Sequence, residues 1–182
     1  RRETESLRVG PAPSNPDVGP LISAERRAAV QTYAQRALLE GQVVSGGRAP
    51  SDIGAQGGYY FLPTLVTNVP TDSPLVQEEI FGPIAVVQSF DSEAEALALA
   101  HATPFGLAAG VWTRDIDRAL RVASQLKAGE VYVNHYFSSG SELPREPYGQ
   151  SGRGVHEGLD TIRAFLRVQG VSIEYASRAE EG

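Results

Sequence analysis

The chain has 182 residues, of which 41% are hydrophobic, and this is enough for one domain of ordinary size with a buried core. Its 16 basic and 22 acidic residues give a net charge of −6, and no run of Lys and Arg is longer than a pair, which argues against nucleic acid or an anionic membrane as a partner. No apolar run approaches the roughly 20 residues that span a bilayer, and no signal peptide is evident, so we expect a cytoplasmic protein.

Two residue types are missing altogether. The chain contains no Cys, which excludes disulfides, thiolate metal sites and a thiol nucleophile within this polypeptide. It also contains no Met and begins with Arg1, although translation normally starts with Met. We therefore expect a fragment or a processed product, with a cleaved leader as the alternative explanation.

The first 20 residues predict a lead-in segment and linker. Residues 9–20 contain four prolines and two glycines, too many helix-breaking residues for a helix, so an extended course is expected.

Residues 24–40 predict an amphipathic helix. Ser23 stands where an N-cap belongs, and Gly41 stands where a glycine in the left-handed conformation would end the helix. The side chains that recur at helical spacing and are expected to face a core are Val30, Tyr33, Ala34, Ala37 and Leu38.

Shorter strands are expected next. Residues 42–45 form a strand candidate, and the polar, glycine-rich residues 46–58 predict an exposed loop. Residues 59–69 alternate only in part, and Pro63 limits them to an irregular or edge strand.

From residue 84 onward, apolar strands alternate with helices. Ser92 and Glu95 form a capping-box pair, and Gly129 is expected to stop the second helix. Because helical crossovers join parallel strands, the class is α/β, with an open, mostly parallel sheet and helices on both faces. The expected elements are strands at 84–90, 107–113 and 130–134 and helices at 92–102 and 114–128.

The last part of the chain changes in character. A helix at 159–165 precedes an apolar stretch at 166–175 that could form the edge of another sheet, and residues 176–182 are polar. The α/β domain is thus expected at residues 21–165, with a C-terminal strand and polar tail at 166–182.

Two glycine motifs lack the context that their function needs. Residues 152–158 resemble a dinucleotide-binding glycine pattern, but the preceding residues 144–150 cannot form the buried strand that the pattern requires. Residues 149–152 approach a nucleophile elbow, yet Arg153 stands where the second glycine should be.

The histidines give no support for a metal site. His101, His135 and His156 are far apart and show no ligand spacing. A catalytic triad assembled in space from Ser138, Ser139 or Ser141 remains an open alternative, because triads are recognised by geometry rather than order.

Five segments, in the same order, carry a resemblance to a known family. The segment at 77–84 resembles the E-E-[IF]-F-G-P-[IV] signature of the aldehyde dehydrogenase superfamily, which lies in its catalytic domain. The other four similar segments lie at 17–22, 58–65, 104–113 and 129–134. The similarity extends from about residue 18 to residue 158, too far for chance.

The resemblance implies a cofactor, NAD or NADP, and two residues that contact it. In the family, the carboxylate at the position of Glu79 binds the nicotinamide ribose, and the aromatic ring at the position of Phe81 packs against the nicotinamide end. A carboxylate can accept both protons of a diol, and a Phe face can restrain a flat ring. The alternative is structural, with Glu79 capping a turn and Phe81 in the core.

The resemblance also implies what this polypeptide lacks. In the family a Cys attacks the aldehyde substrate, and this Cys and the dinucleotide-binding domain precede the segments matched here. We therefore expect the chain alone to be inactive as a dehydrogenase. The resemblance further implies a homo-oligomer that pairs through the C-terminal strand at 166–175.

One loop departs from the family pattern. Residues 144–156 correspond to P-F-G-G-x-K-x-S-G-x-G-R-E, with Arg145, Glu146 and Pro147 in place of Phe-Gly-Gly. Because Glu and Pro adopt fewer backbone angles than glycine, we expect this loop to follow another path.

Two non-redox functions therefore stay open. One is a hydrolase whose nucleophile is Ser138, Ser139, Ser141 or Ser151, and the other is an assembly module that uses the apolar residues 168–175. The sequence decides neither the aldehyde nor the choice between NAD and NADP.

Overall fold

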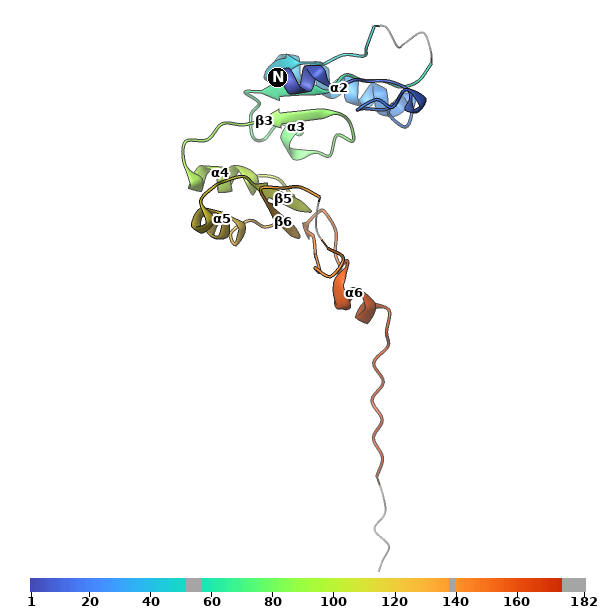
Figure 1. The fold of residues 1–182 in the computed structure, drawn as a ribbon, viewed down its shortest axis with the longest axis vertical. Helices are drawn as coiled ribbons and strands as arrows, with labels where there is room; N and C mark the ends of the chain where they lie inside the picture. The colour runs from blue at the N-terminus through green and yellow to red at the C-terminus, as the bar shows by residue number, and fades with distance from the viewer. Residues whose placement is uncertain (52–56, 138–139, 175–182) are drawn as a thin grey trace, which may run out of the picture. The chain divides into compact units, whose positions relative to one another are not determined.

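The chain contains both helices and strands, and these are interspersed from residue 84 onward (Figure 1). The computed structural model describes residues 1–51, 57–137 and 140–174. The chain divides into two compact units, Arg1–Pro104 and Phe105–Gly182. None of the helices in the described ranges is long and apolar enough to cross a lipid bilayer.

Within its described residues, the first unit contains five helices or helical turns and one three-stranded sheet. In order they are α1 (Arg2–Ser6), the 3-10 turn η1 (Ala12–Ser14), α2 (Ala24–Glu40), β1 (Gln42–Ser45), β2 (Thr64–Thr67), α3 (Pro74–Gln77), β3 (Ile84–Val87) and α4 (Glu93–Ala100).

The sheet of the first unit has the strand order β1-β2-β3. Strand β2 pairs antiparallel with β1 and parallel with β3. Of the irregular or edge strand predicted at 59–69, only Thr64–Thr67 forms a strand, and the edge alternative is wrong because β2 is the central strand. Pro63 lies immediately before the strand, so its missing N–H removes no ladder hydrogen bond.

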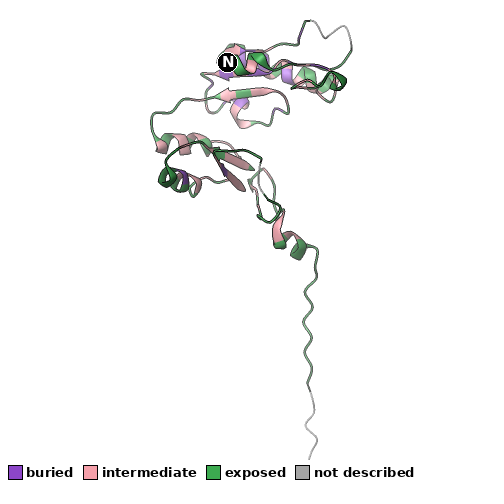
Figure 2. Ribbon diagram, viewed as in Figure 1, coloured by how far each residue is buried: buried purple, intermediate pink, exposed green. Residues whose placement is uncertain are grey.

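Helix α2 begins and packs largely as predicted. The Ser23 hydroxyl accepts a hydrogen bond from the Arg26 backbone N–H at 3.1 Å. Val30 and Ala34 are fully buried in the core that α2 forms with β2, whereas Leu38 is 65% exposed and does not belong to the buried face. Figure 2 shows the buried residues of the first unit gathered around α2 and the sheet.

Gly41 ends α2 for a different reason from the one predicted. Its φ of −146° is extended rather than left-handed. A Cβ at this position would lie 2.8 Å from the Thr67 carbonyl oxygen and 2.8 Å from a Val69 methyl. Glycine is therefore required by the close approach of the β2 strand end, and not by a left-handed cap.

The lead-in segment is folded rather than extended. Val9 and Val18 form an isolated parallel bridge, and the Gly10 N–H donates to the Val18 carbonyl at 3.1 Å. The Asp17 carboxylate accepts from the Arg8 backbone N–H at 2.8 Å and from its Nε at 3.2 Å, and these bonds hold the pKa of Asp17 below its usual value. The Val9–Val18 bridge and the Arg8–Asp17 hydrogen bonds thus close this segment into a loop.

The second unit contains β4 (Phe105–Gly106), β5 (Ala108–Val111), α5 (Ile116–Ala123), β6 (Glu130–Val133), β7 (Tyr148–Gly149) and α6 (Gly158–Ala164). Strands β5 and β6 are parallel and joined through α5, which is the predicted β-α-β unit. The strand expected at 107–113 is present in shortened form as β5, which pairs with β6, whereas the preceding β4, which pairs antiparallel with β7, was not expected. Helix α5 ends at Ala123, before the Gly129 that was expected to stop it.

Residues 166–174 form no strand with other described residues. Val168 is fully exposed, and Val171 and Ile173 are 74% and 66% exposed.

One close contact of the first unit should decide much of its stability. A Cβ at Gly82 would overlap a Cγ2 of Val30, which is fully buried and stiff because it is β-branched. We expect Gly82→Ala to lower the free energy of unfolding by about 1–3 kcal/mol in urea denaturation, because α2 must move to make room. Gly19→Ala is the matched control, since no atom lies within 4 Å of its added Cβ. Equal effects of the two changes would show that the Gly82 contact is not tight.

Candidate functional site

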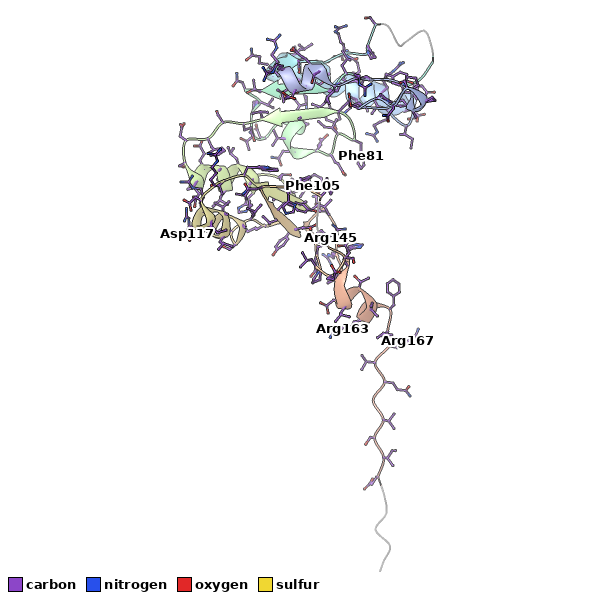
Figure 3. All side chains as sticks on the ribbon, viewed as in Figure 1. Phe81, Phe105, Asp117, Arg145, Arg163 and Arg167 are labelled. Carbon is purple, nitrogen blue, oxygen red and sulfur yellow. The ribbon has the colours of Figure 1, made fainter. Side chains whose placement is uncertain are left out.

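The two residues that resemble cofactor contacts lie in a sharp turn just before β3. Ile80 enters the core with 9% of its surface exposed, whereas Phe81 is 63% exposed and adopts a left-handed φ of 51°. Figure 3 labels Phe81 in this turn. The alternative that Phe81 is a core residue is therefore wrong. The turn buries one side chain and presents the next to solvent.

The two acidic residues of the signature, Glu78 and Glu79, differ in their hydrogen bonding. The Tyr33 hydroxyl donates to the Glu78 carboxylate at 2.6 Å, and this bond raises the pKa of Tyr33. Glu79 is exposed and makes no hydrogen bond or ion pair with other described residues. Glu78 thus connects the turn to α2 through a hydrogen bond. Glu79 is the carboxylate that is available to bind a ligand.

Arg26 is a residue of this site that the sequence did not reveal. Its guanidinium lies 5.5 Å from the centre of the Phe81 ring, and its Nη1 is 3.4 Å from the Ile80 carbonyl oxygen. Arg26 and the turn are more than 50 residues apart in sequence. No local pattern marks such a contact, and a resemblance to the signature does not include it.

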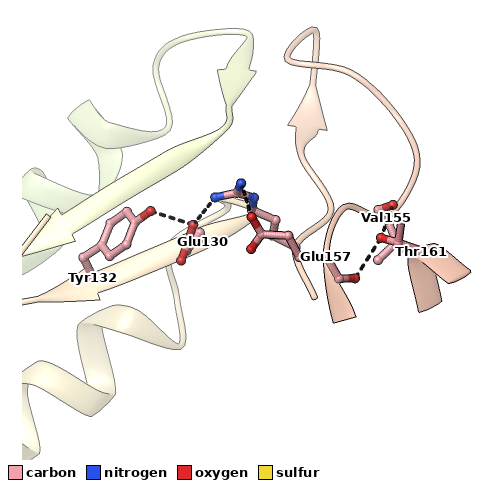
Figure 4. Close-up of polar contacts among 6 residues, drawn as sticks. Glu130, Tyr132, Val155, Glu157 and Thr161 are labelled. Carbon is pink, nitrogen blue, oxygen red and sulfur yellow. Dashed lines mark hydrogen bonds and ion pairs between the residues drawn. The ribbon is translucent and has the colours of Figure 1, made fainter. Parts of the chain in front are cut away.

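In the second unit, the departure from the family pattern creates an ion-pair cluster. Arg145 donates from Nη1 to Glu130 at 2.9 Å and from Nη2 to Glu157 at 2.8 Å (Figure 4). The same Glu130 oxygen accepts from the Tyr132 hydroxyl at 2.6 Å. The hydrogen bond to Glu130, reinforced by the charge of Glu157, raises the pKa of Arg145.

Backbone contacts fix the same loop at its base. Arg145 and His156 exchange two backbone hydrogen bonds of 2.9 and 2.8 Å. Gly129 lies against the Glu146 carbonyl, where an added Cβ would approach to 2.7 Å. Residues 145–156 therefore form a closed loop, and its two ends are held to each other and to β6.

The serines gain little support as nucleophiles. Ser138 and Ser139 lie outside the described residues. The Ser151 hydroxyl accepts from the Gly106 N–H at 3.0 Å, and this bond ties the loop at 144–156 to the segment at 104–113. Among the residues that the structure describes, no hydrogen bond links Ser141 or Ser151 to a histidine. A Ser-His pair thus has no geometric basis in the described part of the chain.

An aromatic cluster surrounds the end of β6. Tyr136 lies 4.9 Å from Tyr132, 4.5 Å from Phe137 and 6.5 Å from Trp112, measured between ring centres. Tyr132 is buried, whereas Trp112 and Phe137 are 64% and 78% exposed. The cluster therefore packs against the buried Tyr132 ring, while the rings of Trp112 and Phe137 are exposed to solvent.

Comparisons with known proteins identify the family of this chain. Residues 1–171 match the aldehyde dehydrogenase family. The chain belongs to this family. It is 42% identical to 4-trimethylaminobutyraldehyde dehydrogenase of Rattus norvegicus over 177 residues, which is 95% of this chain and 36% of the relative. It is 40% identical to betaine aldehyde dehydrogenase of Bacillus subtilis over 154 residues, which is 84% of this chain and 31% of the relative.

Solved structures give the same result. A double mutant of betaine aldehyde dehydrogenase from Staphylococcus aureus, in complex with NAD+, has a TM-score of 0.86 and 34% identity over 91% of this chain and 34% of that protein. The unmutated enzyme with NAD+ gives a TM-score of 0.85 at 33% identity, over 91% of this chain and 33% of that one. The α/β class is confirmed, and the chain spans about a third of the length of these aldehyde dehydrogenases.

The Arg145 cluster gives a prediction for the loop. We expect Arg145→Ala to speed proteolytic cleavage within residues 144–157 severalfold, because Glu130, only 13% exposed, loses its cation and the loop loses its side-chain anchor. Limited proteolysis followed by mass spectrometry measures this. Arg163→Ala is the control, since Arg163 makes a single ion pair with Asp160 in which the side chains are 72% and 48% exposed. Equal rates of cleavage in the two variants would show that Arg145 does not anchor the loop.

Proposed function

We propose that this chain is the C-terminal part of an NAD(P)-dependent aldehyde dehydrogenase, which oxidises an aldehyde to a carboxylic acid. The observation that carries the proposal is the turn before β3, where Glu79 has a carboxylate free of described partners and Phe81 an exposed ring. Glu79 would accept hydrogen bonds from the two hydroxyls of the nicotinamide ribose. Phe81 would pack against the nicotinamide and restrict its rotation.

The bound cofactor would supply the hydride acceptor, and the choice between NAD and NADP stays open. Similar enzymes have been solved with NAD+. A carboxylate and an apolar ring on one turn fit a ribose joined to a flat ring, because each half of the ligand meets the side chain that suits it.

The reacting thiol would come from a segment outside these residues, because the chain contains no Cys. We propose that the chain alone is inactive as a dehydrogenase for this reason. Exposed apolar residues support the presence of further contacting segments: Trp112 and Ile116 line a groove of about 660 Å³ and are 64% and 66% exposed. Exposed apolar surface of this kind is typical of contact sites.

The substrate we propose is an aldehyde that carries a quaternary ammonium group. Two relatives are named for substrates of this type, betaine aldehyde and 4-trimethylaminobutyraldehyde. The exposed aromatic faces of Trp112, Tyr136 and Phe137 can attract a cation. Glu130 and Glu157 outnumber Arg145, so the adjacent cluster has a net negative charge and also favours a cation.

A homo-oligomer through residues 166–175 is also proposed. The described part of this segment exposes Val168, Val171 and Ile173 and pairs with no other described strand. An unpaired apolar segment can add to the sheet of a second copy.

The cofactor site is tested with two matched carboxylates in the complete polypeptide of the gene that contains this chain. We expect Glu79→Gln to raise the KM for NAD(P) about tenfold, because a neutral amide accepts hydrogen bonds more weakly than a carboxylate. Glu78→Gln, beside it, should leave this KM unchanged, since Glu78 bonds to Tyr33. An unchanged KM in the Glu79 variant would show that Glu79 does not bind the cofactor.

The substrate class is tested by comparing 4-trimethylaminobutyraldehyde with a neutral analogue in which tert-butyl replaces trimethylammonium. We expect kcat/KM to favour the cation roughly threefold to thirtyfold, from cation–π attraction, and Tyr136→Leu to reduce that ratio. The neutral analogue controls for general effects on the enzyme. Equal kcat/KM values for the two aldehydes would rule out the cationic substrate.

A further inference from the structure

Phe81 holds a backbone conformation that its own side chain does not favour. Its φ of 51° is left-handed, a region that residues with a Cβ avoid unless their surroundings impose it. Burial of the ring cannot impose it, because the side chain is 63% exposed. The neighbours Ile80, which is buried, and Gly82, which packs against Val30, fix the backbone of the turn, so the position of the exposed Phe81 ring depends on a separate contact.

Arg26 makes that contact at two points. Its guanidinium lies 5.5 Å from the Phe81 ring centre, within cation–π range, and its Nη1 reaches the Ile80 carbonyl at 3.4 Å. The carbonyl belongs to the peptide unit that immediately precedes Phe81. Arg26 therefore contacts both the ring and the backbone of the left-handed turn.

Arg26 is itself held on a rigid element. It lies in the first turn of α2, where its N–H is bonded to the Ser23 cap at 3.1 Å. One turn further on, Val30 packs directly against Gly82 at the other side of Phe81. Helix α2 thus fixes the turn from both sides, and Arg26 is the part of this support that touches the exposed ring.

We propose that Arg26 is a positioning residue for the cofactor site, acting through Phe81. Because the guanidinium covers one face of the ring, the opposite face is left to pack against the nicotinamide. The inference rests on the proposed function, in which Phe81 contacts the nicotinamide end and Glu79 the ribose. Arg26 itself need not touch the reacting atoms.

The test separates the nicotinamide from the rest of the cofactor. In the complete polypeptide, dissociation constants are measured by titration calorimetry for NADH, or NADPH if that is the cofactor, and for the corresponding ADP-ribose, which lacks nicotinamide. We expect Arg26→Ala to weaken binding of the reduced cofactor roughly threefold to tenfold and to leave ADP-ribose binding unchanged. Arg26→Lys, which keeps a cation over the ring, should recover part of the loss.

Arg27→Ala is the matched control. Arg27 follows Arg26 on the same helix and also lies over an aromatic ring, 5.9 Å from the centre of Tyr59. Its removal deletes the same charge and a similar contact away from Phe81, so reduced-cofactor binding should not change. Equal melting temperatures of the variants would show that the fold is intact. In kinetics, Arg26→Ala should raise the cofactor KM and leave kcat nearly unchanged.

Each result has one meaning. If Arg26→Ala weakens binding of both the reduced cofactor and ADP-ribose, Arg26 has a general electrostatic or structural role. If it weakens binding of neither, Phe81 does not need Arg26. Either outcome overturns the inference. Glu79→Gln serves to test the proposed function separately, because it should weaken ADP-ribose and the reduced cofactor alike. If Glu79→Gln changes neither ligand, the ribose site itself is misassigned.

Discussion

The contact between helix α2 and the turn before β3 is the constraint on which the first unit depends. Val30 is fully buried against Gly82, and Ile80 packs in the same core. These contacts fix the distance between the turn and helix α2. With Ile80 pointing inward, the left-handed turn directs Phe81 outward. The core therefore sets the position of the candidate cofactor contacts, although neither contact is part of the core.

The second unit fixes its loop by charge rather than by apolar packing. Its buried residues are few, and Arg145 instead joins Glu130 on β6 to Glu157 at the start of α6. Breaking this cluster removes the counter-charge of the Glu130 carboxylate, whose side chain is only 13% exposed, so we expect a greater effect than from breaking an exposed ion pair. The Tyr132 hydroxyl donates to Glu130, and this hydrogen bond connects the ion-pair cluster to the aromatic cluster.

The sequence predicted features that depend on neighbouring residues. The Ser23 cap and the Ser92 cap are confirmed at 3.1 and 3.2 Å, because a cap and its helix lie within three residues of each other. Glu79 and Phe81 were identified from a resemblance. The exposure of Leu38 and the contacts of Arg26 and Arg145 were missed, because they depend on segments that meet only in the folded chain.

The division of roles between Glu78 and Glu79 shows how a binding group is kept available. Two adjacent carboxylates in a turn could both be drawn into structural bonds, and one of them is, since Glu78 accepts from Tyr33. Glu79 is exposed and makes no hydrogen bond or ion pair with other described residues. A carboxylate that the fold does not use can give its full hydrogen-bonding capacity to a ligand. In the proposed enzyme, this chain would contribute groups that bind and orient the cofactor, while the reacting thiol would come from elsewhere.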